Sequence, residues 1–323
     1  MIDFITLLKP LTESEIIFVV KKNGLKTNSR NGVVFYDNEE EKNLKQHNGV
    51  FIRIETTCRL KIECSLHKYW NETSGKERNN YNRFSMPDAK KAFDRLLRDK
   101  GIDFKDLNIY NYEIGLNLNV SKDCRAYMDK MTGIGASGSE KPLFVNPRYK
   151  DRRVKTTVFH ERARKYFKVY DKVYESKEKK RKVIPDGNIL RIETVNRRLD
   201  NFGAFDFFSR DNLAKLFDQF FRDWRTLQFE RDLITPKGTG RARQKLCEEI
   251  IRDGKEKVLT RARERHKNGS LKDWEYRNIR EFIANEWDAL KGRITFVRSD
   301  EEAEFRKLLN VNYTLLKHDE IIK

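Results

Sequence analysis

Short apolar runs separated by turn-forming residues dominate the first half of the chain. EIIFVV (15–20), VVFYD (33–37) and FIRIETT (51–57) are rich in β-branched and aromatic residues, and Asn-Gly pairs at 23–24 and 31–32 mark turns. In RLKIECS (59–65) apolar and charged residues alternate, which is typical of a strand with one polar face. This part of the chain is therefore predicted to form strands joined by tight turns.

The next segments combine one helix with further strands. Residues 85–101 (SMPDAKKAFDRLLRDKG) predict a helix, because they hold a capping serine, an early proline, an apolar stripe and a closing glycine. Residues 107–120 (LNIYNYEIGLNLNV) alternate again, with Glu113 on the polar side. Residues 154–159 and 166–172 predict a hairpin, and 188–199 (NILRIETVNRRL) predict one more strand.

Beyond residue 200 the apolar positions recur at helical spacing, as in SRDNLAKLFDQFFRDW (209–224), and this pattern continues through 240–290. The chain is therefore predicted to be α+β. Residues 1–205 would form a catalytic domain around an antiparallel or mixed sheet, and residues 206–323 a basic helical region. Acidic side chains on neighbouring strands of such a sheet can converge on one face.

The net charge of the chain limits the kinds of partner that it could bind. The chain of 323 residues has 68 Lys and Arg against 50 Asp and Glu, a net charge of +18. Such a surface attracts a polyanion, because each cation that neutralises a phosphate releases condensed counterions. DNA, single- or double-stranded, is the predicted partner. An anionic membrane surface, or a basic protein with no such partner, is the alternative.

Cysteine and histidine usage excludes several classes of site. The four cysteines form no C-x-x-C pair, and we expect no signal peptide and no membrane span, which together predict a cytoplasmic location. The five histidines are scattered and form no His-x-His or i,i+4 pair, which disfavours a histidine-based metal site.

Three glutamates lie in the middle of strand-like segments: Glu63, Glu113 and Glu193. A carboxylate in a strand is costly to bury unless it is paired or binds a metal. Each could simply face solvent beside a neighbouring cation. Together, in a strongly basic protein, they indicate a site for Mg²⁺ or Mn²⁺, which prefer oxygen ligands and can polarise a phosphate.

The segment KYFKVYDKVY (165–174) adds a candidate nucleophile. A tyrosine phenolate can attack a phosphodiester and hold the cut strand covalently, provided that a cation activates it. Tyr166 and Tyr170 lie among Lys165, Lys168 and Lys172, whereas Tyr174 is the weakest candidate. Core packing or base stacking is the alternative role for each tyrosine.

Several motifs resemble, in order, those of rolling-circle replication initiators of the filamentous-phage type and, more loosely, of staphylococcal plasmids. They are MIDF, KIECSLHKYWN with NRF after a polar loop, YNYEIGLNL, KYFKVYDK and ILRIET, all within residues 1–200. The resemblance implies an enzyme that nicks one strand at an origin through a tyrosine, keeps the 5′-phosphate covalently and leaves a 3′-OH. The most specific pieces are E-x-G-x-N, Y-D-K and L-R-x-E.

The resemblance also implies roles for individual residues. Glu113 and Glu193 match acidic positions of the family motifs, and Tyr170 and Lys172 match Y-D-K. Phe159 stands where relatives carry a nucleophilic tyrosine, so that either Tyr166 or Tyr170 is the nucleophile or the chain forms no covalent intermediate. The expected DNA contacts come from nearby cations: Lys165, Lys168, Arg191, Arg197 and Arg198.

The basic helices beyond residue 206 are expected to bind origin duplex or to mediate homodimerisation, with a solvated helical face as the alternative. Two other functions remain open at this point. One is non-catalytic binding of DNA or RNA, and the other is a relaxase- or transposase-like nickase of a mobile element, which would use the same chemistry.

Overall fold

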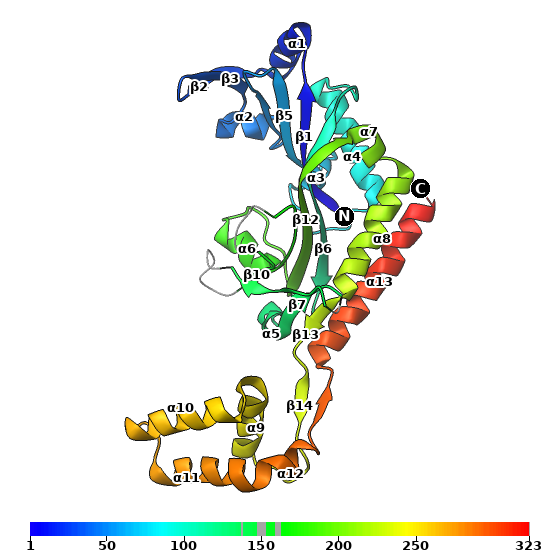
Figure 1. Cartoon of the computed structure of the whole chain (residues 1–323). Helices are drawn as coiled ribbons and strands as arrows, with labels where there is room; N and C mark the ends of the chain where they lie inside the picture. The colour runs from blue at the N-terminus through cyan, green and yellow to red at the C-terminus, as the bar shows by residue number, and fades with distance from the viewer. Residues whose placement is uncertain (137, 147–152, 159–162, 323) are drawn as a thin grey trace. The chain divides into compact units, whose positions relative to one another are not determined.

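The computed structural model describes residues 1–136, 138–146, 153–158 and 163–322. Its main feature is a large antiparallel sheet with the strand order β2-β3-β4-β5-β1-β6-β12-β11-β10-β9 (Figure 1). The strands are β1 (Ile2–Pro10), β2 (Lys26–Arg30), β3 (Val33–Asp37), β4 (Phe51–Ile54), β5 (Arg59–Ser65), β6 (Asn108–Asn119), β9 (Phe144–Val145), β10 (Val154–Thr156), β11 (Lys165–Asp171) and β12 (Ile189–Gly203). The predicted α+β class is confirmed.

A smaller sheet and a set of helices complete this part of the chain. The small sheet has the order β13-β7-β8, with β7 at Met131–Ile134, β8 at Lys141–Pro142 and β13 at Leu227–Phe229. The helices are α1 (Glu13–Asn23), α2 (Glu41–Gln46), α3 (Leu66–Thr73), α4 (Met86–Lys100), α5 (Cys124–Lys130), α6 (Lys172–Glu178), α7 (Ala204–Phe207), α8 (Arg210–Arg225) and α13 (Asp300–Ile322). Within the described residues, no helix is both long and apolar enough to cross a membrane.

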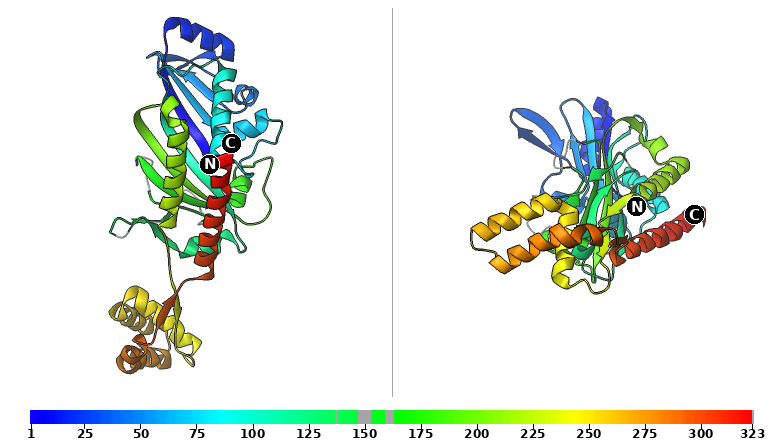
Figure 2. Two further views of the ribbon diagram at one scale, coloured as in Figure 1. Left: turned by 90° about the vertical axis from the view of Figure 1, so that its right-hand side faces the viewer. Right: turned by 60° about the horizontal axis from the view of Figure 1, so that its bottom comes forward.

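The two faces of the large sheet differ in character. Helices α4, α8 and α13 run along one face (Figures 1 and 2). There Phe167 of β11 packs edge-on against Trp224, whose indole N–H donates to the Thr194 hydroxyl of β12. Tyr112 of β6 packs against Phe207 of α7 on the same side. Since side chains alternate along a strand, the neighbouring residues Glu113, Glu193 and Lys168 lie on the opposite face.

One predicted strand is wrong. Residues 15–20, assigned to a strand on β-propensity, lie in helix α1. The helix begins at a capping box, in which the Thr12 side chain accepts from the backbone of Glu15 and the Glu15 carboxylate accepts from the backbone of Thr12. It ends at Gly24, whose left-handed backbone closes the last turn. Local capping therefore outweighs the β-propensity of the run.

The chain divides into two compact units, and the division differs from the predicted boundary at 205/206. The first unit comprises residues 1–229 and 301–323. Helices α8 and α13 belong to it because their aromatic residues pack together, as Phe217 and Phe221 do with Tyr313. Its core is continuous from the sheet to these helices. Long-range packing of this kind leaves no periodic signal in the sequence.

The second unit spans residues 230–300 and has a small core of its own around Cys247, Phe282 and Trp287. It is helical, as predicted for residues 240–290. Its elements are β14 (Asp232–Ile234), α9 (Arg241–Asp253), α10 (Lys255–Lys267), α11 (Asp273–Glu281), a π-helical turn (Phe282–Glu286), α12 (Trp287–Lys291) and β15 (Thr295–Val297). Strands β14 and β15 pair with each other, so both chain connections of the unit leave it through one two-stranded ribbon.

Candidate functional site

Three of the sequence motifs meet on the sheet face that lies opposite α4, α8 and α13. The register between β11, β12 and β6 places Lys168, Glu193 and Gly115 in one cross-strand row. The next row toward one end holds Tyr166, Val195 and Glu113, and the next toward the other end holds Tyr170, Arg191 and Asn117. Adjacent strands are about 4.8 Å apart, so these side chains are close neighbours. We call this group of residues the polar cluster.

Glu193 is the centre of the polar cluster. It is 2% exposed, and three donors reach its carboxylate. The Lys168 ammonium lies 2.7 Å from Oε2, while the Tyr170 hydroxyl and the Arg191 Nε lie 2.7 and 2.6 Å from Oε1. Burial opposes ionisation of Glu193, but the two cations outweigh it and hold the pKa of this carboxyl well below its usual range. Glu193 is therefore a buried, fully paired anion.

Arg191 connects Glu193 to the rest of the polar cluster. Its guanidinium is buried and also donates to the Asn117 side chain at 2.9 Å and to the Asp3 carboxylate at 2.5 Å. The guanidinium lies across Gly115, where an added Cβ would come within 2.4 Å of Nη2 and 3.2 Å of the Glu193 Cγ. The E-x-G-x-N and L-R-x-E motifs thus have one physical explanation, since the glycine makes room for the arginine and the asparagine binds it.

Asp3 belongs to the polar cluster but was not among the residues predicted from sequence. The pairing of β1 with β6 shifts register between Ile2 and Phe4, which leaves Asp3 as an extra residue on the strand. Its carboxylate accepts from Arg191, from the Ser65 hydroxyl at 2.9 Å and from the Asn80 amide at 2.7 Å. An acid inside an otherwise apolar first strand was the available signal, but the bulge that turns it toward Arg191 cannot be read from the sequence.

Glu113 differs from Glu193 in that its surroundings raise its pKa instead of lowering it. Burial, together with the negative charge of Glu193, raises its pKa to about 7, and the nearby Lys168 only partly offsets this. No hydrogen bond from the described residues reaches its carboxylate. The negative charges of Glu193 and Asp3 disfavour a third ionised carboxylate here, and the positive charges of Lys168 and Arg191 only partly offset them. A carboxyl that titrates near neutrality is suited to general acid–base catalysis.

The three tyrosines of the 165–174 segment occupy different environments. Tyr170 is buried and its hydroxyl is committed to Glu193; burial and that negative charge raise its pKa well above the usual value. Tyr166 is 8% exposed, interacts electrostatically with the Lys168 ammonium, and has the Arg197 guanidinium 5.3 Å from its ring centre. Tyr174 lies in α6 and donates to Glu178, away from the cluster. Cations also lie near the rings of Tyr170 and Tyr174, so what sets Tyr170 apart from Tyr166 is that its hydroxyl is bound to Glu193.

The remaining catalytic predictions are Lys172, which borders the polar cluster, and Phe159. Lys172 is buried, binds Glu175 at 2.8 Å and lies 5.5 Å from the Tyr170 ring centre. Burial, together with the positive charge of Arg191, lowers its pKa. Lys172 thus lies beside Tyr170, and its catalytic role stays a prediction. Phe159 lies outside the described residues.

The predicted DNA contacts divide into two groups. Lys168, Arg191 and Arg197 belong to the polar cluster or border it. Lys165 instead points toward α8, where it pairs with Asp223 at 2.7 Å. Arg198 is exposed, and its backbone has a left-handed conformation.

Of the three glutamates predicted to bind a metal, Glu113 and Glu193 converge in the polar cluster, whereas Glu63 lies apart on the same sheet face. Glu63 lies on β5 and pairs with Lys61 at 2.9 Å; two strands, β1 and β6, separate it from Glu193 on β12. At about 4.8 Å per strand, this places their backbones at least roughly 14 Å apart. Within the described part of the chain, no three His, Cys, Asp or Glu side chains are grouped so that they could hold a metal ion. These residues therefore do not by themselves fit a Mg²⁺ or Mn²⁺ site.

Comparisons with known proteins find similarity among solved structures. No protein-family model and no curated protein matches the chain. Among solved structures it is similar to a rolling-circle replication initiator protein from Geobacillus stearothermophilus, with a TM-score of 0.36, 12% identity, and coverage of 76% of this chain and 89% of that one. At such values the geometry of the site, rather than the similarity, has to support a functional proposal.

Proposed function

We propose that the chain is a rolling-circle replication initiator that nicks one DNA strand by tyrosine transesterification, with Tyr166 as nucleophile and Glu113 as general base. The observation that supports the proposal is the polar cluster: a carboxyl with a pKa of about 7 shares one sheet face with a tyrosine beside Lys168 and Arg197. The net charge of +18 suits a DNA substrate.

In the proposed step, ionised Glu113 takes the phenolic proton of Tyr166, directly or through one water. The phenolate oxygen attacks the phosphorus of the scissile phosphodiester, a P–O bond to Tyr166 forms, and the bond from phosphorus to the 3′ oxygen breaks. The 3′ oxygen leaves with its electron pair and takes up a proton from solvent. Lys168 and Arg197 stabilise the charge that passes from the phenolate to the phosphate.

The proposal includes Mg²⁺ or Mn²⁺ because the sequence predicts such a cation. Among the described carboxylates of the cluster, Glu193 and Asp3 are already bound by donors and Glu113 is assigned as the base, so the described side chains supply no set of ligands for a metal. A metal bound at the cluster would polarise the scissile phosphate. The steps above are assigned to the chain's own side chains and do not depend on it.

The experiment compares wild-type protein with Tyr166→Phe, Glu113→Gln and Tyr174→Phe on labelled single-stranded oligonucleotides that tile the replicon encoding the chain. Reactions are run with Mn²⁺ and with EDTA, which also tests the metal. Wild type and Tyr174→Phe should cut one oligonucleotide and retain its 3′ fragment on the protein, joined through the newly formed 5′-phosphate. The other two variants should bind that oligonucleotide normally without cutting it.

Two outcomes would contradict the proposal. Cleavage by Tyr166→Phe at the wild-type rate would remove Tyr166 from the chemistry. Binding without cleavage by wild type on every oligonucleotide would favour a non-catalytic nucleic-acid-binding protein. Cleavage at a transfer origin or transposon end, rather than at a replication origin, would leave the chemistry intact and assign it to a relaxase or transposase.

A further inference from the structure

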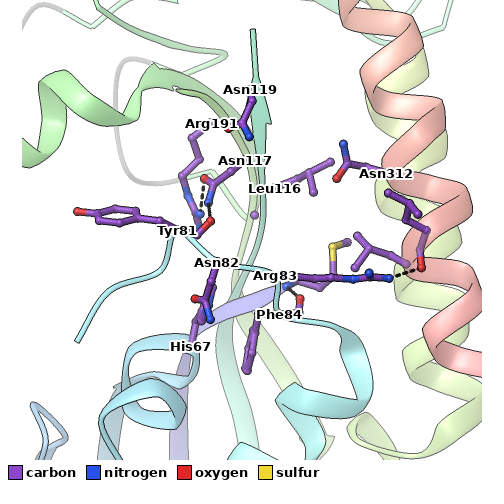
Figure 3. A pocket seen from close by; sticks show the side chains of 14 residues that line it. His67, Tyr81, Asn82, Arg83, Phe84, Leu116, Asn117, Asn119, Arg191 and Asn312 are labelled. Atoms are coloured by element: carbon purple, nitrogen blue, oxygen red, sulfur yellow. Dashed lines mark hydrogen bonds between the residues drawn. The ribbon is translucent and has the colours of Figure 1, made fainter. Parts of the chain in front are cut away.

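A cavity of about 200 Å³ opens beside the polar cluster, at the point where β1 begins and β6 runs on past it (Figure 3). Gly115, Asn117 and Arg191 belong to both the cavity wall and the cluster. Any ligand in the cavity therefore lies next to the proposed reaction centre.

One wall of the cavity is an unpaired strand edge. Strand β1 pairs with β6 only as far as Ile2 and Ile114, and the Gly115 N–H then donates to the Met1 carbonyl. Beyond this point β6 continues to Asn119 with β12 as its neighbour. Backbone groups of alternate residues point the same way, so Asn117 directs its N–H and C=O toward the cavity, where no described backbone group pairs with them.

The facing wall comes from α13 and is mostly apolar. Leu315 and Leu316 line it together with Asn312. The Asn312 amide nitrogen donates to the Leu308 carbonyl at 2.9 Å, and its oxygen is left as an acceptor that no described residue binds. Figure 3 shows this side chain on the cavity side of the helix. The cavity thus has an apolar surface facing a row of hydrogen-bonding groups.

Aromatic rings and a cation line the rest of the cavity. His67 stacks on Phe84 with ring centres 4.4 Å apart, and burial lowers its pKa to about 3, so it is a neutral aromatic surface at physiological pH. Arg83 is about half exposed at the mouth, where it pairs with Asp319 at 2.7 Å and donates to the Leu315 carbonyl. The guanidinium of Arg191 lies further inside.

We infer that this cavity holds one unstacked nucleobase of the single strand that adjoins the scissile phosphate. A base is flat and amphipathic: its faces suit leucine and aromatic surfaces, and its edge suits amide and backbone groups. Arg83, about half exposed, suits a flanking phosphate. The inference deepens the proposed function and rests on it for the identity of the ligand.

The test uses full-length protein with Tyr166→Phe, so that binding is measured without cleavage. Fluorescence anisotropy gives the Kd of labelled oligo(dA), oligo(dC), oligo(dT) and an abasic strand of equal length. We expect one homopolymer to bind about tenfold more tightly than the others, the size expected for one well-placed base contact. Asn312→Leu and Leu315→Trp should each reduce this preference to about twofold.

The matched controls are Asn310→Leu and Val311→Trp, which alter exposed positions of the same helix outside the cavity. They should keep the preference, and thermal melts followed by circular dichroism should show all four variants folded. Equal discrimination in the cavity variants and the controls would overturn the inference, as would equal binding of all strands by the parent protein. Neither result affects covalent nicking by the protein with Tyr166 intact, so the two proposals fail separately.

Discussion

Replacing Gly115 with alanine should destabilise the fold by displacing Arg191. The added Cβ would lie 2.4 Å from Nη2 of that side chain, against an ordinary contact distance of 3.4 Å or more. The guanidinium therefore has to retreat by about 1 Å, while its bonds to Asp3, Glu193 and Asn117 span only 2.5 to 2.9 Å. A shift of that size breaks at least one charge-assisted hydrogen bond in a buried ion-pair network, which costs about 2 to 4 kcal/mol.

Urea unfolding followed by tryptophan fluorescence measures this cost. The matched control is Gly203→Ala, whose Cβ would meet only the Asp206 carboxylate at 3.6 Å, an ordinary contact. We expect Gly115→Ala to lower the free energy of unfolding by about 2 to 4 kcal/mol and Gly203→Ala to change it by less than about 1 kcal/mol. If the two variants were equally stable, the explanation given for the E-x-G-x-N motif would be wrong.

Two further predictions concern Glu113, and a third concerns the second unit. Nicking should rise with pH around a midpoint near 7, because Glu113, whose pKa is about 7, must be ionised to act as a base; a rate independent of pH between about 5.5 and 8.5 would exclude this role. The folded-state pKa of Glu113 lies above its ordinary value of 4.5, so its contribution to stability is full below about pH 4.5 and is lost as pH rises through 7. Urea titrations should accordingly show Glu113→Gln gaining about 1 to 3 kcal/mol over wild type between about pH 4.5 and 8, and an unchanged difference across that range would contradict the shifted pKa. Replacing residues 235–294 with an Asn-Gly turn would join the paired strands β14 and β15 directly. Gel-shift titrations should then show weaker binding of origin duplex, while single-strand nicking is retained. Equal loss of both activities would indicate a folding role for the second unit.

Much of the polar cluster could be predicted from sequence because its residues lie on regular strands. Glu113 and Glu193 each lie on the polar side of an alternating strand pattern, and a carboxylate that becomes buried there has to be paired or functional. Their motifs lie on neighbouring strands, β6 and β12, so their convergence needed only the correct sheet order.

Other features depend on geometry that the sequence does not encode locally. Asp3 reaches Arg191 through a β-bulge, and a bulge has no reliable residue signature when no glycine marks it. Glu63 resembles Glu113 in its strand pattern, yet the strand order places β1 between them. Helix α1 was missed because its β-branched residues concealed a Thr12–Glu15 capping box. The return of α13 to the first unit depends on packing between residues far apart in the chain, such as Phe217 and Tyr313.

The most direct test of the central claim is to identify the residue that carries DNA after nicking. Wild-type protein is incubated with the cleaved single-stranded oligonucleotide and Mn²⁺, the adduct is digested with protease and nuclease, and mass spectrometry locates the modified residue. The proposal predicts a 5′-phosphotyrosine at Tyr166. An adduct at Tyr170 or at any residue other than Tyr166, or cleavage without any adduct, would contradict it.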